Sequence, residues 1–193
     1  MDNKNFDSLS GLEKLKIEIQ VKAKNGIDFI LAATIIWFGI FLIWKFSNYS
    51  LYNKSMFIFI LVSLLTPSAL LLSKVFKTNW KIKDNALQPL GLWLNFAQLI
   101  YFPFLFFILI KYPNYFLMTY AIITGAHLFP FTWFYNEIGY AVASVIISVG
   151  SMIIALSVQP DNFFYIPIFT ALALLILGIK ISIRNKKMQK EWN

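Results

Sequence analysis

The stretch that decides the fold is Ile27–Phe46, IDFILAATIIWFGIFLIWKF, which carries charge only at Asp28 and Lys45. A helix needs about 20 mostly apolar residues to cross the hydrocarbon core of a bilayer. This run has that length, and a polar segment of 26 residues precedes it. The run is too long for the apolar region of a cleaved signal peptide, and no small-x-small cleavage site follows it. We therefore expect a retained first transmembrane helix.

Further runs of similar length and apolarity follow, separated by short connectors. Together with the first they predict six transmembrane helices: Ile27–Phe46, Ser55–Phe76, Leu90–Ile110, Pro113–Trp133, Glu137–Val158 and Phe163–Ile183. Composition agrees, because 59% of residues are hydrophobic and 13% charged, against roughly 45–50% and 25% in soluble domains. The chain has no cysteine, which excludes disulfides and thiolate metal ligands. The expected fold class is all-α, a polytopic membrane helix bundle.

The segment before the first span is expected to be a cytoplasmic arm, residues 1–26, with its own helix. Ser10 and Glu13 have the spacing of a capping box, which marks a helix start. Residues 15–24 also alternate apolar and polar, a strand pattern. No partner strand exists in the chain, so we favour an amphipathic helix lying on the inner membrane surface. Residues 27–183 then form the bundle, and residues 184–193 a basic cytoplasmic tail.

The basic residues predict the orientation. The chain has 17 Lys and Arg against 9 Asp and Glu, a net charge of +8. Fourteen of the 17 fall on the arm, the second connector and the tail, and three on the other side. Cytoplasmic loops carry this excess, so both termini are expected in the cytoplasm of a bacterial cell, in its cell membrane. These charges suit anionic inner-leaflet lipid rather than nucleic acid, because they flank apolar spans and Arg184 is the only arginine.

Polar residues inside the spans are the candidate site, because burying them without partners is costly. Asn95 and Gln98 share a helical face of the third span, and Thr124 and His127 share a face of the fourth. Acidic residues stand at the inner boundary. At 1.5 Å per residue these groups lie in the cytoplasmic half of the bilayer. If the faces converge, they line a cavity open to the cytoplasm. The candidate ligand-binding residues are His127, Asn95, Gln98, Thr124, Asp28 and Glu137.

Each of these features also has a purely structural interpretation. Asn95 and Gln98 can act as hydrogen bonds between helices, and His127 can be a neutral core histidine. Prolines are expected to interrupt four spans, at Pro67, Pro103, Pro130 and Pro167, which kinks a helix and frees a backbone carbonyl. One histidine cannot supply a His-rich zinc site, although the acidic residues and His127 could conceivably hold a divalent ion. No metal and no cofactor is predicted.

The segment from Thr124 to Tyr135, TGAHLFPFTWFY, carries a resemblance. With the short basic stretch Val21–Gly26, VKAKNG, and the span count, it resembles an uncharacterised family of small bacterial multi-pass membrane proteins. The resemblance covers most of the chain. It implies the class of protein and brings no assigned activity, cofactor or site residue.

Three functions remain open on the sequence. The first is a small ligand, ion or proton bound in a cytoplasm-facing intramembrane cavity, with transport as its purpose. The second is a non-catalytic interaction or sensor subunit, which predicts a fully packed bundle. The third is a membrane-embedded lipid-modifying enzyme, which needs His127 within reach of Asp28 or Glu137. The sequence sets neither the ligand nor the oligomeric state.

Overall fold

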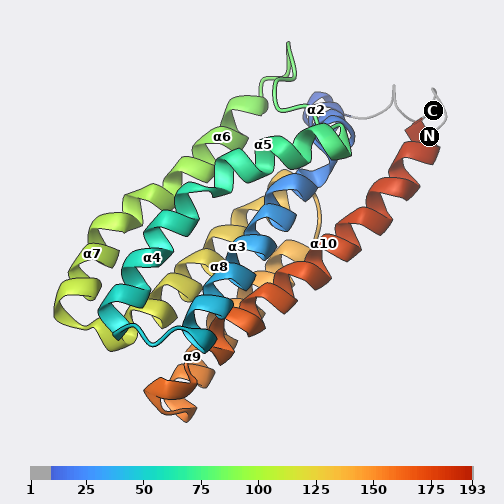
Figure 1. The fold of residues 1–193 in the computed structure, drawn as a ribbon. Helices are drawn as coiled ribbons and strands as arrows, with labels where there is room; N and C mark the ends of the chain where they lie inside the picture. The colour runs from blue at the N-terminus through green and yellow to red at the C-terminus, as the bar shows by residue number, and fades with distance from the viewer. Residues whose placement is uncertain (1–9, 193) are drawn as a thin grey trace.

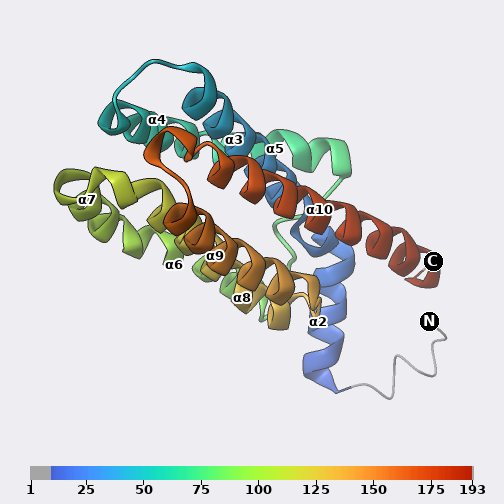
Figure 2. The same cartoon turned by 90° about the horizontal axis from the view of Figure 1, so that it is seen from below.

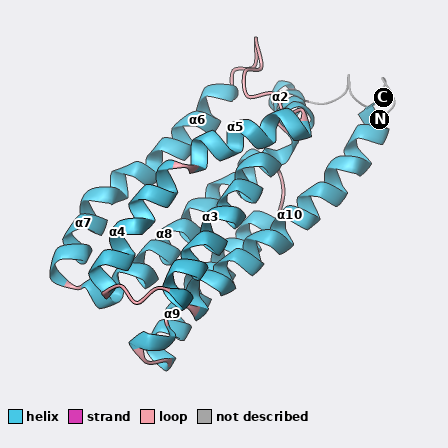
Figure 3. Cartoon of the chain, in the orientation of Figure 1, coloured by secondary structure: helices cyan, strands magenta, loops and turns pink. Residues whose placement is uncertain are grey.

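The computed structural model describes residues 10–192, which contain helices and no strand (Figure 3). Two parts of the expected cytoplasmic segments lie outside the described residues. They are residues 1–9 of the arm, which include Lys4, and residue 193 of the tail. The α-helices are α2 (Gly11–Lys22), α3 (Ile27–Phe46), α4 (Leu51–Ser63), α5 (Leu65–Phe76), α6 (Gln88–Ala97), α7 (Phe102–Lys111), α8 (Phe116–Phe134), α9 (Gly139–Ser157) and α10 (Tyr165–Trp192). Short 3₁₀ turns occupy Lys24–Gly26, Gln98–Tyr101, Pro113–Tyr115 and Pro160–Asn162.

Five helical segments of the described chain are long and apolar enough to cross a membrane. They are Lys24–Phe46, Leu51–Phe76, Gln88–Lys111, Gly139–Ser157 and Pro160–Lys190. The expected fourth span, Pro113–Trp133, also forms a helix, α8, but α8 is not among these five. Its tyrosine, histidine, proline and threonines lower its hydropathy. The described structure is therefore an all-α membrane protein with five candidate membrane-spanning segments.

Two of the expected spans are broken near the middle. The second divides into α4 and α5 at Leu64, and the third divides into α6 and α7 around the 3₁₀ turn Gln98–Tyr101. Pro67 and Pro103 follow these breaks, as expected of residues that cannot donate a backbone hydrogen bond. The other two prolines do not interrupt their helices, contrary to the sequence prediction. Pro130 lies inside continuous α8, and Pro167 lies in the first turn of α10, where a missing N–H costs little.

The long helices form two layers (Figures 1 and 2). One layer contains α4–α5, α3 and α10 side by side, and the other contains α6–α7, α8 and α9. Along one edge the layers close where α9 packs on α10. One end of the bundle contains α2, the α5–α6 loop and the C-terminal part of α10, and we call it the arm end (Figure 1). The 28 residues of α10 span about 42 Å at 1.5 Å per residue, so its end projects beyond a core about 30 Å thick.

The two edges of the bundle are packed differently. In the edge formed by α8, α9, α3 and α10, large side chains such as Trp37, Ile147 and Leu174 are almost fully buried. Gly125 of α8 permits a close approach, because a Cβ there would lie 2.9 Å from the backbone nitrogen of Ser148 on α9. In the edge formed by α4–α5 and α6–α7, no residue of α6 is fully buried within the described structure. We call these the packed edge and the open edge.

The arm contains a helix, not a strand. Ser10 and Glu13 form the expected capping box, with the Ser10 side chain accepting from the Glu13 N–H. Helix α2 packs on the arm end through Ile19, which is buried, and the Lys16 ammonium lies 4.1 Å from the centre of the Trp133 ring. Its contact with a membrane surface stays a prediction.

Candidate functional site

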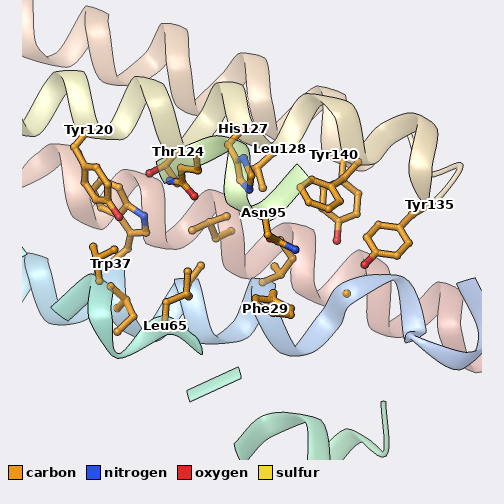
Figure 4. Close-up of a pocket in the computed structure, with 18 residues that line it drawn as sticks. Phe29, Trp37, Leu65, Asn95, Tyr120, Thr124, His127, Leu128, Tyr135 and Tyr140 are labelled. Atoms are coloured by element: carbon orange, nitrogen blue, oxygen red, sulfur yellow. The ribbon is translucent and has the colours of Figure 1, made fainter. Parts of the chain in front are cut away.

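A cavity separates the two layers at the open edge and consists of two adjoining chambers. The His127 chamber, of about 70 Å³, lies between α3, α5, α6 and α8 (Figure 4). The Asp28 chamber, of about 300 Å³, continues from it towards the arm end and is lined there by Asn79, Trp80 and Ile82 of the α5–α6 loop. Gly26, Phe29, Val62, Leu65, Asn95, Gln98 and Tyr135 line both chambers, so the two are continuous along one wall.

Both helix breaks lie on the walls of this cavity. Val62 and Leu65 flank the α4–α5 break and line both chambers, and Gln98 begins the 3₁₀ turn between α6 and α7. Pro67 has no N–H to donate to the Ser63 carbonyl four residues earlier. At membrane depth, irregular backbone is tolerated where it lies within protein or lines a polar cavity. The two helix breaks are therefore accommodated because their irregular backbone lines the cavity.

The His127 chamber combines aromatic walls with neutral hydrogen-bonding groups. Thr124 and His127 of α8 and Asn95 of α6 are directed into the same space, opposite Trp37 and Leu65 (Figure 4). Thr124 and His127 point the same way because residues three apart on a helix share a face. Asn95 donates its amide to the Gly91 carbonyl of its own helix at 2.9 Å, which leaves its side-chain oxygen free to accept.

Other polar groups of this chamber lack partners among the described residues. The Thr124 hydroxyl is buried and makes no hydrogen bond of good geometry there, although Tyr120 stands one turn earlier. The Gln98 amide and the His127 imidazole likewise make no hydrogen bond to a side chain or backbone group within residues 10–192. The His127 ring instead stands edge-on to Phe131, with 5.4 Å between ring centres. These groups can bind a molecule in the chamber.

Asp28 lies at the start of α3 and lines the larger chamber. Its side chain is 1% exposed. One carboxylate oxygen, Oδ2, accepts hydrogen bonds from the Thr78 hydroxyl at 2.5 Å and the Trp80 indole N–H at 2.6 Å. The other, Oδ1, accepts from the Phe29 backbone N–H at 3.0 Å. Trp80 also stacks on Phe29, with ring centres 4.7 Å apart, so Asp28 holds the α5–α6 loop over the chamber.

Glu137 lies outside both chambers, in an ionic cluster at the arm end. It is 4% exposed and pairs with Lys180 at 2.8 Å and Arg184 at 2.6 Å, both from α10. It also accepts from the Gly139 N–H at 2.9 Å. Burial opposes its charge, but the hydrogen bonds from Lys180, Arg184 and Gly139 outweigh burial and lower the pKa of Glu137 to about 2. This carboxylate holds α10 to the α8–α9 turn.

A second set of contacts ties the arm to α9 and α10. Lys24, Asn25 and Gly26 all have positive φ, so the chain turns sharply between α2 and α3. The buried Asn25 amide donates to the Asn185 side chain at 2.6 Å, and its backbone carbonyl accepts from the Tyr140 hydroxyl at 2.6 Å. A Cβ at Gly26 would lie 2.9 Å from the Tyr135 hydroxyl, so this position needs glycine.

The structure thus brings together four of the six expected site residues in one chamber, places Asp28 in the next, and separates Glu137 from both. No group of three His, Asp or Glu side chains that could hold a metal occurs among the described residues, so the conceivable mixed ion site is not assembled. Glu137, bound to Lys180 and Arg184 of α10, does not line the chamber that contains His127.

Sequence reasoning missed Trp80, Thr78, Arg184 and Tyr140, which fix the acidic residues and the arm. One signal was available for Arg184. Glu137 begins the predicted fifth span and Arg184 follows the predicted sixth span, so the two opposite charges are expected on the same side of the membrane, where they can pair. No comparable signal pointed to Trp80, because its neutral indole carries no charge that would mark Asp28, 52 positions away, as its partner.

The fold and the chambers define a helical integral membrane protein with a cavity between its layers. Residues 12–184 match the model of a family of unknown function, DUF7010, and the chain belongs to that family. This confirms the resemblance seen in the sequence. No curated protein and no solved structure matches the chain.

Proposed function

We propose that this protein binds a small, partly apolar molecule in the chambers between its layers and moves it across the membrane. The observation that carries the proposal is that three polar groups lining one chamber, the buried Thr124 hydroxyl and the partly buried Gln98 and His127 side chains, make no hydrogen bond of good geometry within residues 10–192. A buried polar group without a partner costs about 1–3 kcal/mol. A ligand that hydrogen-bonds to them recovers that free energy, and the aromatic walls bind its apolar part.

The broken helices support transport. In transporters, discontinuous helices near the middle of the membrane form the substrate site and move during alternating access. Here two broken helices border one cavity at the less closely packed edge. Movement of α4–α5 and α6–α7 against the packed edge would open the chambers without disturbing the α8–α9 and α9–α10 contacts.

The proposal includes the topology. With α8 as the sixth span, the arm and the end of α10 lie on the same side, and the positive residues assign that side to the cytoplasm. The Asp28 chamber then faces the cytoplasm behind the α5–α6 loop. The exposed lysines of α2 and α10 meet anionic lipid headgroups at this surface.

The test is thermal unfolding of the purified protein with the neutral probe N-benzylacetamide, which has one aromatic ring and one amide. At 100 times its dissociation constant, a ligand adds about 2.7 kcal/mol to stability, which raises the melting temperature. We expect the wild type to show this shift and His127→Ala to lose most of it. Phe129→Ala, on an exposed face of the same helix, is the matched control and should keep it.

If the wild type shows no shift with this probe or with charged aromatic analogues, the chambers do not bind ligands of this class. That result would favour the interaction-subunit hypothesis. A shift that His127→Ala retains in full would place binding elsewhere on the protein.

A further inference from the structure

The lining of the Asp28 chamber has an unusual charge for this protein. The whole chain carries +8, and lysines surround the arm end at positions 24, 77, 81 and 83. None of the described residues that line either chamber is a lysine or arginine. Asp28 is the one acidic side chain among these lining residues, so the chamber wall is negative inside a positive protein.

The Asp28 carboxylate accepts hydrogen bonds, but no cationic side chain of the described residues pairs with it. Within residues 10–192 it forms no salt bridge, and the nearby Lys24 ammonium instead donates to the Phe76 carbonyl at 2.7 Å. A carboxylate offers about four acceptor positions, and Thr78, Trp80 and the Phe29 N–H occupy three in the described structure. The start of α3 favours the negative charge through the helix dipole. One acceptor position and most of the charge therefore lack a protein partner in the described structure, and Asp28, which is 1% exposed, acts on the chamber mainly through its charge.

Aromatic rings make up much of the remaining wall. They are Phe29, Trp80, Phe96, Phe102, Phe134 and Tyr135. The faces of such rings attract organic cations, more strongly where water is excluded. Within the described residues no group of three His, Asp or Glu side chains stands on this wall, so it lacks the carboxylate-rich ligand set typical of a divalent metal ion. An anion would be repelled by Asp28.

We infer that the Asp28 chamber binds a small organic monocation, an amine or quaternary ammonium compound, through Asp28 and the aromatic wall. This rests on the proposed function, since it names the substrate class of the same cavity. The 300 Å³ chamber is the size of small-molecule sites. The neutral groups of the adjoining His127 chamber then receive the uncharged part of the same molecule.

The test compares three probes of similar shape on the full-length protein in lipid nanodiscs: benzyltrimethylammonium, N-benzylacetamide and phenylacetate. Binding is followed by isothermal titration calorimetry. We expect the cation to bind about tenfold or more tightly than the neutral probe, and the anion to bind weakest, because of the carboxylate and the rings. Equal or weaker binding of the cation would overturn the inference. If the neutral probe still bound, the proposed function would stand.

Two variants locate the effect. Asp28→Asn removes the charge and keeps one acceptor oxygen, which can still bind Thr78 and Trp80, while the acceptor for the Phe29 N–H is lost; it should abolish the preference for the cation over the neutral probe. Asp161→Asn makes the same change of charge at an exposed site in the α9–α10 turn and should keep the preference. If Asp28→Asn fails to fold, Phe29→Leu should weaken the cation severalfold and the neutral probe by a smaller factor, because leucine replaces apolar contact but not the cation–π attraction. A preference unchanged in these chamber variants would place the cation elsewhere.

Discussion

The packed and open edges of this bundle differ in how their helices meet. At the packed edge, α8 and α9 approach closely through Gly125, and buried Ile147 and Leu174 fill the interior. At the open edge, two broken helices surround chambers lined by polar groups without protein partners. Apolarity does not explain the difference, because α8, which is less apolar than the five candidate spans, lies in the packed edge. The difference shows that apolarity places a helix in the membrane, whereas small residues and prolines decide how closely it packs.

The largest expected effect is on the ionic cluster that anchors α10. Glu137→Gln leaves Lys180 and Arg184 without their buried partner. We expect the free energy of unfolding to fall by about 2–4 kcal/mol. This is somewhat less than a fully buried ion pair usually costs when one partner is removed, because Lys180 is half exposed and can be solvated. Unfolding in mixed detergent micelles measures it. Asp161→Asn, at an exposed site, should cost almost nothing, and an equal loss there would contradict a specific role for the cluster.

The same carboxylate predicts a pH dependence. The pKa of Glu137 is about 2 in the folded protein, below the ordinary value of 4.5 for a solvated glutamate. Its contribution is therefore complete above the unfolded value and is lost as pH falls from about 5 towards 2. Melting temperatures across this range should fall more steeply for the wild type than for Glu137→Gln. Parallel curves would show that the ion pairs contribute nothing to folding.

The next effect compares a glycine inside the packed edge, Gly125, with Gly39 of α3, which faces α4 of the open edge. Gly125→Ala puts a methyl group 2.9 Å from the α9 backbone, whereas Gly39→Ala meets Leu61 side-chain carbons at 3.6 Å or more. We expect Gly125→Ala to destabilise by about 1–3 kcal/mol through overpacking. Gly39→Ala should stabilise by about 0.5–1 kcal/mol, because alanine is the better helix former. The same unfolding measurement applies, and equal effects would mean that the two interfaces are packed alike.

The smallest effect concerns two buried threonines. The Thr170 hydroxyl bonds to the Ile166 carbonyl at 3.0 Å, whereas the Thr124 hydroxyl has no partner among described residues. Thr124→Val should be neutral or stabilising by up to about 1 kcal/mol, and Thr170→Val should cost about 0.5–1 kcal/mol. A larger loss of unfolding free energy for Thr124→Val would contradict this and would mean that the hydroxyl binds a water or a ligand. If the loss persists in ligand-free protein, the partner is water.

Much of the fold was predictable because a span of about 20 apolar residues has few alternatives in a bilayer. Helical spacing also placed Asn95 with Gln98, and Thr124 with His127, on common faces. Periodicity gives a residue's face but not its neighbour on another helix. For this reason the Asp28–Trp80 contact and the separation of Glu137 from the cavity became visible only in the structure. Proline positions suggested breaks in four spans, and the structure shows two, because Pro130 and Pro167 fit within intact helices.

The central claim is that the open edge holds a cavity reached from the arm end, and cysteine accessibility tests it most directly. The chain has no natural cysteine, so each introduced one reports alone. Gln98→Cys lines the chambers, Ile147→Cys lies in the packed edge, and Ile100→Cys lies on an exposed apolar surface. A membrane-impermeant maleimide should label Gln98→Cys from the arm side only, and should label neither control. Labelling of Gln98→Cys no faster than Ile147→Cys would contradict the claim.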